Sequence, residues 1–278
     1  MIGHNQPMLA TRYPCARWAT MSRRASVSAH RAADGAHGPA AINRNRSDKS
    51  ELRRSSPRLR ARRRSAAPLV TSVKNPRQPQ LVISCHADTG FRSHRLIREN
   101  DAFVGHLDNF AGVHAVMSAY FSGRMTSDSL RIELTYGEET AMEGACEVRK
   151  TLSPDDVVVV VDVTGTVPER DITIEKCRSP RMRRFVSEAL EGLSYALYEG
   201  CPDPIADADE CDVYGEELGN VCFLGIPCAG GDYNAGVVSC REKSIRTASE
   251  ALVRLAEHFA RETHARSSAP GEADKPRS

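Results

Sequence analysis

The sequence predicts a single α/β domain, built as a three-layer α/β/α sandwich around a mostly parallel central sheet. Two observations lead to this prediction. Short apolar runs recur from about residue 69 onwards and are typical of buried strands. Segments with the apolar spacing of amphipathic helices lie between them. Strands that alternate with helices favour a parallel sheet covered by helices.

Four segments are predicted as strands. The first is the apolar run LVIS at 81–84, and LRIELTY at 130–136 reads as the second. The run VVVVVD at 157–162 is continuous and β-branched, as expected for a strand buried on both faces. The fourth strand, VCFLGIP at 221–227, is also apolar and ends in Gly-Ile-Pro.

Three segments are predicted as helices. In 108–123 the apolar residues follow helical spacing, with Asp108 near the N-cap and Gly123 as a stop signal. The segments 179–200 and 244–263 are also amphipathic and predict two more helices. Each predicted helix is flanked by predicted strands or ends the folded part of the chain, which fits one domain.

The first 66 residues differ in composition from the rest. They hold 15 of the 38 lysines and arginines but only 3 of the 36 acidic residues. Subtraction leaves 23 basic and 33 acidic residues, so a basic arm precedes an acidic body. The arm at 1–66 has no sustained apolar period and is expected to be disordered, as is a tail at 265–278. This leaves 67–264 as the folded domain.

Three accounts of the arm stay open. Clustered arginines could contact the phosphates of a nucleic acid or another polyanion. An Arg- and Ser-rich segment with few acids also fits an organelle transit peptide. The third account, a wrongly assigned start or translated upstream sequence without a role, is favoured, because nothing beyond composition supports the other two. The basic run has no interleaved aromatic residues to stack on bases, which weighs against a nucleic-acid partner.

Composition is that of a globular protein from a reducing compartment. Hydrophobic residues make up 40% of the chain and charged residues 27%. The nine cysteines are odd in number, scattered and without a CxxC pair, which does not suit a disulfide framework. No apolar run approaches the ~20 residues of a membrane span. We therefore expect a cytoplasmic protein with neither a membrane nor a nucleic-acid partner.

Polar side chains stand at four places where ligands gather in such a fold, around the carboxyl ends of the strands. Each alone has an ordinary explanation, such as a helix cap, a turn residue or a solvated loop. Together they form one set of ligand-type residues on one predicted edge of the sheet. The set is His86, Asp88, Asp108, Glu138, Glu139 and Asp162.

These residue types suit a metal site. Imidazole and carboxylate groups are ligands that zinc, cobalt and manganese accept. Asp88 follows His86 by two residues in an extended chain, so it can hold the second ring nitrogen of that histidine. Asp108 has two oxygens and can bridge two ions. Of the adjacent glutamates, Glu139 can point to a metal and Glu138 to a water, which makes Glu138 the predicted general base.

The motifs HADT, GHLDNFAG, TYGEETAMEGA and VVVDVTG resemble, in that order, those of the co-catalytic zinc exopeptidases. That group includes leucyl-type aminopeptidases, glutamyl and tetrahedral aminopeptidases, and related carboxypeptidases and deacylases. The intervals are 22 residues from His86 to Asp108, 30 more to Glu138 and 24 more to Asp162, and they are specific as a set. The resemblance covers about 81–255 and is to a catalytic domain alone, without an inserted second domain.

The resemblance implies a zinc-dependent metallo-exopeptidase or amidohydrolase, with a zinc exopeptidase-like fold, a peptide or acyl-amino substrate and one or two divalent ions. His86, Asp108 and Asp162 would hold one ion. Asp108, Glu139 and a final histidine would hold the second. Glu138 would take a proton from water and pass it to the leaving amine.

The final histidine is where the sequence departs from the family pattern. It should follow the last strand, near IPCAGGDYNAGVVSC, but that segment holds Asn234, a weak neutral ligand, and Asp232. Two hypotheses follow. One is an aminopeptidase-type hydrolase, and the other is an impaired or non-catalytic binding protein with the same fold. The substrate, the number of metals and the oligomeric state stay open.

Overall fold

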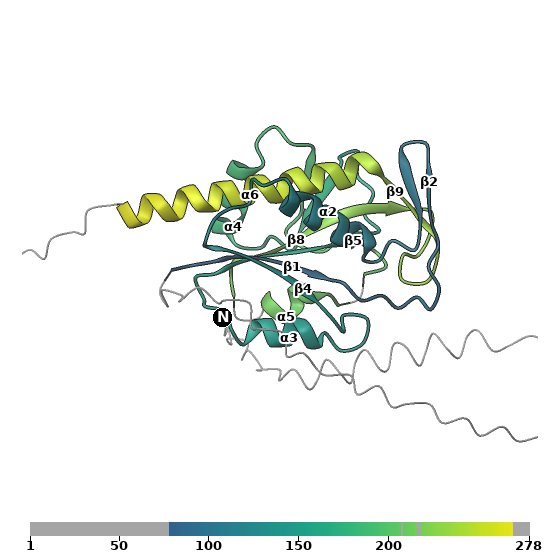
Figure 1. The fold of residues 1–278 in the computed structure, drawn as a ribbon, viewed down its shortest axis with the longest axis horizontal. Coiled ribbons are helices and arrows are strands. Elements are labelled where there is room, and N and C mark those ends of the chain that lie inside the picture. The colour runs from purple at the N-terminus through teal and green to yellow at the C-terminus, as the bar shows by residue number, and fades with distance from the viewer. Residues whose placement is uncertain (1–77, 207, 216–217, 269–278) are drawn as a thin grey trace, which may run out of the picture.

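The computed structural model describes residues 78–206, 208–215 and 218–268. The predicted basic arm at 1–66 lies outside these residues. In the described part, one sheet lies between two layers of helices (Figure 1). The α/β/α fold class predicted from the sequence is confirmed.

The strands and helices have the following bounds. The strands are β1 (Leu81–His86), β2 (Leu96–Glu99), β3 (Ala102–Gly105), β4 (Leu130–Thr135), β5 (Val157–Thr164), β6 (Ile172–Glu175), β7 (Tyr195–Leu197), β8 (Val221–Ala229) and β9 (Val238–Arg241). The helices are α2 (Phe110–Phe121), α3 (Glu143–Arg149), α4 (Pro180–Ala189), α5 (Glu210–Gly215) and α6 (Glu242–Ser268).

The sheet is parallel at its centre and antiparallel at one side. The main path runs β2-β3-β9-β8-β5-β1-β4. Its four strands β8, β5, β1 and β4 are mutually parallel, as the alternation of strands and helices predicts. The strands β9, β3 and β2 extend the sheet in antiparallel fashion, and β6 pairs antiparallel with β8.

The central strands are apolar on both faces because both faces are covered. On β1, Leu81 and Ile83 belong to the core that packs against α2, α4 and α6. Val82, which points the opposite way, belongs to the core that packs against α3 and α5. Figure 1 shows α2, α4 and α6 on one side of the sheet and α3 and α5 on the other. This leaves the strand ends as the place where polar groups can gather.

Two predicted boundaries were wrong. The segment 179–200 is not one helix, because α4 ends at Ala189 and the strand β7 follows. Gly192 has a φ of +78°, a left-handed conformation that breaks a helix and that glycine adopts without strain. At the other end, α6 continues through 265 to Ser268, into the segment predicted as tail. None of the helices in the described ranges is long and apolar enough to cross a bilayer.

Candidate metal centre

The carboxyl ends of β1, β4 and β5 bring the predicted site residues together. His86 is the last residue of β1, and Asp162 lies near the end of the neighbouring strand β5. Asp108 precedes the N-cap of α2, and Glu138 and Glu139 lie in the loop between β4 and α3. Parallel strands put these loops on one edge of the sheet, which is why residues far apart in sequence meet there.

The imidazole of His86 lies between two buried carboxylates. Its Nε2 atom is 3.1 Å from Asp108 Oδ1 and 3.1 Å from Asp162 Oδ2. All three residues are buried, with His86 only 1% exposed. Because one ring nitrogen carries at most one proton, it cannot serve both carboxylates as a hydrogen-bond donor. Asp162 takes the hydrogen bond.

Asp108 Oδ1 is left as a buried oxygen without a hydrogen bond. A buried carboxylate oxygen without a partner is unfavourable, and a cation at this point would satisfy it. One oxygen or nitrogen each from His86, Asp108 and Asp162 lie within 4.8 Å of one another. One imidazole and two carboxylates are a donor set that zinc accepts. The residues present therefore fit a divalent metal ion.

Asp88 lies beside the other nitrogen of the ring. Its Oδ1 atom is 3.5 Å from His86 Nδ1, and the same oxygen accepts a hydrogen bond from the Glu138 backbone N–H at 3.4 Å. Burial raises the pKa of Asp88, but the interactions with His86 outweigh it, and the pKa is lowered. Asp88 is thus an ionised group between the histidine and the glutamate loop.

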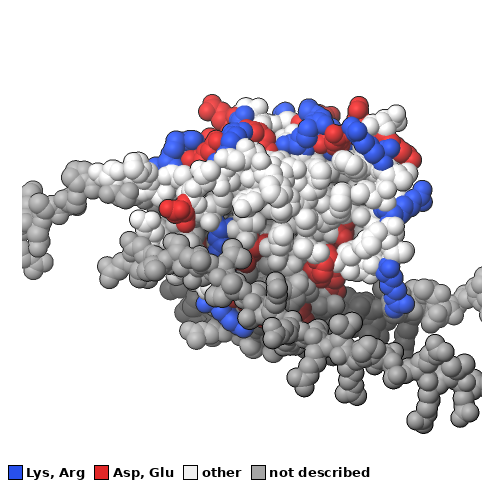
Figure 2. Space-filling model, viewed as in Figure 1, with Lys and Arg blue, Asp and Glu red and all other residues white. Residues whose placement is uncertain are grey.

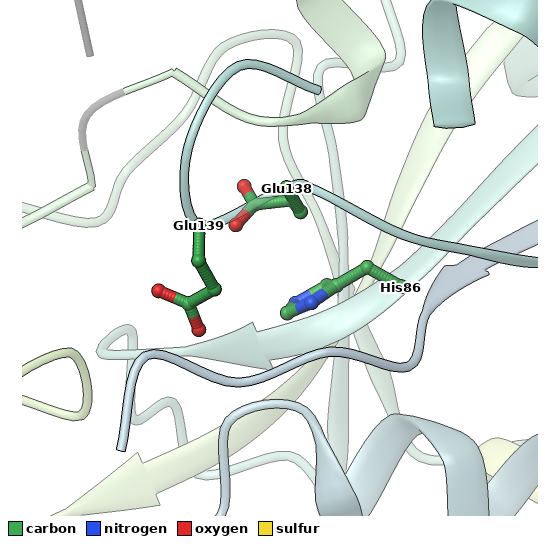
Figure 3. Close-up of side chains that lie close together, drawn as sticks. All are labelled: His86, Glu138 and Glu139. Atoms are coloured by element: carbon green, nitrogen blue, oxygen red, sulfur yellow. The ribbon is translucent and has the colours of Figure 1, made fainter. Parts of the chain in front are cut away.

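The two adjacent glutamates face His86 from the loop after β4. Figure 3 shows the carboxylates of Glu138 and Glu139 and the ring of His86 converging on one space. A ligand atom from each lies within 4.8 Å of the others. Glu139 fits tightly against Gly90, where an added Cβ would lie 2.9 Å from Glu139 Oε2. A glycine at this position lets the backbone approach the carboxylate.

Burial and like charge shift the pKa of most groups in the cluster upwards. Burial is the largest cause for Glu138, whose pKa rises to about 9; the charge of His86 opposes the rise, and Asp162 and Asp108 add to it. Burial, then the charge of Asp108, raises the pKa of Glu139 to about 7. Burial also raises the pKa of Asp162 to about 7. In the absence of a metal ion, these carboxyl groups therefore hold protons at pH values where exposed carboxyl groups have lost them.

For His86, burial and the neighbouring charges change the pKa in opposite directions. Burial lowers the pKa of its imidazole, but the neighbouring carboxylates, Asp162 first, raise it well above the ordinary value. In the absence of a metal ion, the ring thus keeps a proton and serves as the positive charge of the cluster. A divalent cation would take over that role and release the proton.

A buried polar network under the site was not predicted. Glu210 on α5 is 1% exposed, and it accepts hydrogen bonds from Ser84 Oγ at 2.7 Å and from Thr135 Oγ1. Ser84 Oγ is also 2.9 Å from the hydroxyl of Tyr214. These contacts tie β1 and β4 together beneath His86. The sequence carries no clear signal for this, since Glu210 belongs to an acidic run that resembles a solvated surface.

The loop after β8, which was expected to supply a final histidine, contributes no residue to the groups of described residues that could hold an ion. Asn234 and Asp232 are exposed, and the Asn234 backbone N–H donates to Asp232 Oδ1 at 2.9 Å. Among the described residues, Asp232 belongs to none of the groups that could hold an ion. Tyr233 between them is buried, and its hydroxyl donates to Asp203 Oδ2 at 2.9 Å. The loop is therefore fixed by a tyrosine.

Several solved structures that are similar to this chain are named as aminopeptidases. An M18-family aminopeptidase from Thermotoga maritima matches with 13% identity and a TM-score of 0.45, over 59% of this chain and 48% of that one. An aminopeptidase from the archaeon Desulfurococcus kamchatkensis matches with 16% identity and a TM-score of 0.49, over 60% and 54%. Yeast aminopeptidase 1 matches with 13% identity and a TM-score of 0.45, over 59% and 48%.

The matched part of this chain spans about half the length of each of these proteins. No protein-family model matches the sequence, and no curated protein matches it significantly.

Proposed function

We propose that the chain is a metal-dependent hydrolase of peptide or amide bonds, of the aminopeptidase type. The observation that carries the proposal is the His86 ring between Asp108 and Asp162, with Glu138 and Glu139 across the same space. Its substrate class is a peptide or an acyl-amino compound. This constellation could hold a cation and a proton carrier within reach of each other, which are the two requirements for attack by water on an amide.

The ligands of a first zinc ion would be His86, Asp108 and Asp162. Asp108 and Glu139 would contribute to a second ion, for which the described residues offer no further histidine in the cluster. Cobalt and manganese accept the same donors. When bound, such an ion polarises the substrate carbonyl and lowers the pKa of water.

Glu138 is the proposed general base. Its carboxylate faces His86 (Figure 3), and burial raises its pKa to about 9, so a proton is readily held there. A cation held by the neighbouring carboxylates would lower that pKa. Glu138 can then take a proton from water and deliver it to the leaving amine. Asp88, whose Oδ1 atom is 3.5 Å from His86 Nδ1, would hold the ring in place from the opposite nitrogen.

The direct test is Glu138→Gln in the full chain, loaded with zinc and assayed on aminoacyl anilides, dipeptides and N-acyl amino acids. We expect the rate to fall by about 10²–10⁴-fold, because a general base is removed, while the zinc content stays unchanged. The matched control is Glu99→Gln, which neutralises an exposed carboxylate on β2. Normal turnover by Glu138→Gln would remove Glu138 from the mechanism. Absence of hydrolysis by the wild-type chain on all three substrate classes would overturn the proposed function.

A second candidate function is favoured by one observation, the exposed Asn234 in the loop after β8. A chain that lacks the final histidine could bind a substrate-like ligand in the same fold without turning it over. Asn234→His separates the two functions. An impaired enzyme should gain about one zinc ion per chain and at least ~10-fold in rate, since an imidazole is a far better zinc ligand than an amide. A binding protein should gain neither, as measured by elemental analysis and the same assays.

A further inference from the structure

Away from the sheet edge, α4 and α6 bring together a second group of metal-ligand side chains. Glu188 belongs to α4, and His258 and Glu262 lie one turn apart on α6. Figure 1 shows α4 beside α6 on one side of the sheet. His258 lies 16 residues beyond the first residue of α6, about 24 Å along the helix. The group shares no residue with the His86 centre.

The distances in this group suit a shared ion better than hydrogen bonds. His258 Nε2 is 3.5 Å from Glu188 Oε2 and 3.5 Å from Glu262 Oε1. Hydrogen bonds between such atoms are about 2.7–3.2 Å long, and this nitrogen is buried without a hydrogen-bond partner. A tetrahedral zinc ion with bonds of about 2.0–2.1 Å separates its ligand atoms by about 3.3–3.4 Å. The two observed separations are close to that value.

The three side chains are also arranged for access. The His258 ring packs against Phe185 on α4, with ring centroids 5.4 Å apart, so its orientation is fixed by the helix contact. The His258 side chain is 14% exposed, whereas Glu188 is 53% exposed and Glu262 36%. Histidine and glutamate four residues apart lie on the same face of a helix, a spacing that metal sites use. An ion can therefore enter from solvent and keep water as a further ligand.

We propose that Glu188, His258 and Glu262 form a binding site for a divalent transition-metal ion of the zinc class. Two carboxylates and an imidazole are donors that such an ion accepts. Because Glu188 comes from α4 and the other two from α6, the ion joins the two helices. The site does not depend on metal binding at the His86 centre.

The test compares metal content and melting temperature of the full chain and three variants after chelator treatment and titration with zinc. Glu188→Gln removes a charged ligand that is half exposed, so the fold is expected to persist, and His258→Gln removes the imidazole. Glu191→Gln, just beyond α4, neutralises a nearby exposed carboxylate that is not part of the group. Circular dichroism of the metal-free proteins checks that each variant folds.

The wild-type chain and Glu191→Gln should bind one more zinc ion than Glu188→Gln and His258→Gln. Their zinc-induced rise in melting temperature should also exceed that of the two ligand variants. Equal zinc content in the wild-type chain and Glu188→Gln would overturn the proposal. The test compares the zinc content of the wild-type chain with that of each variant. Zinc bound at the His86 centre contributes equally to both and does not affect the difference.

Discussion

His86 is the residue on which the candidate metal centre depends. One ring nitrogen faces Asp88, and the other faces both Asp108 and Asp162. Carboxylates that lie this close repel one another, and burial adds to the unfavourable energy of their charged forms. Protons or a cation must therefore compensate them. The repulsion among these carboxylates and the unpartnered oxygen of Asp108 both favour a bound metal ion.

The raised pKa values of the carboxyl groups around His86 should make the stability of the metal-free chain depend on pH. Asp162 and Glu139, with pKa values raised to about 7, and Glu138, raised to about 9, each add stability below their ordinary pKa and lose it as pH rises through the raised one. The raised pKa of His86 acts in the same direction. We therefore expect the metal-free chain to lose stability steadily from about pH 5 to pH 9, measured as the urea midpoint in chelator.

With saturating zinc the slope should reverse over the same range, because ligands must lose protons to bind metal. The lowered pKa of Asp88 acts only below its ordinary value of about 4, outside this window. A metal-free midpoint that is flat or rises between pH 5 and pH 9 would show that these carboxyls are not strained by burial.

At the scale of elements, the sequence predicts the buried strands better than the short ones. β1, β5 and β8 are apolar runs covered on both faces, and the structure contains all three. The strands β2 and β3 were not predicted, since each is only four residues long and β2 is also exposed along its length. β7 is three residues long, and its apolar residues continue the pattern of the preceding helix α4. Its pairing with β6, rather than its own sequence, makes it a strand.

The start of α2 is the element boundary that positions Asp108. The N-cap residue Asn109 accepts a hydrogen bond from the Gly112 backbone N–H, and its amide donates to the Val161 carbonyl, each at 2.9 Å. One buried side chain thus holds α2 to β5, next to two proposed ligands. The predicted N-cap was Asp108, one residue earlier, and the shift leaves the Asp108 carboxylate available to the site.

Asn109→Ala should destabilise the chain by about 2–3 kcal/mol, since it removes a cap and leaves the buried Val161 carbonyl without its donor. It should also weaken zinc binding, because the hydrogen bonds of Asn109 to Gly112 and Val161 hold the adjacent residue Asp108 in position. Ser179→Ala is the matched control, because Ser179 caps α4, which supplies no ligand to the His86 centre. Both variants are made in the Glu188→Gln background, where the α4–α6 site is removed. That variant should lose about 1 kcal/mol and bind zinc normally. Urea unfolding and zinc titration measure both effects, and equal zinc affinity in the two variants would contradict the positioning role of Asn109.

At the scale of the whole molecule, the cluster could be predicted because sheet topology maps strand ends to one edge. Four separate segments supply its residues, and each segment follows or ends a recognisable strand or precedes a helix. The contacts of Glu210 with Ser84 and of Tyr233 with Asp203 could not be predicted from the sequence. Their places depend on how α5 packs under β1 and how the loop after β8 folds onto Asp203. Such contacts are set by tertiary packing and leave no period in the sequence.

Zinc should stabilise the whole fold, because the proposed ligands come together only when the sheet is formed. Ligand binding restricted to the folded state adds about 2.7 kcal/mol at a free concentration 100 times the dissociation constant. For a domain of this size that is a rise of roughly 5–10 °C in melting temperature. The measurement belongs in the Glu188→Gln background, where the α4–α6 site is removed. There, Asp162→Asn should abolish most of the zinc-induced rise, while Glu99→Gln should keep it. If Asp162→Asn retains the full rise, zinc stabilises the chain from somewhere other than the end of β5.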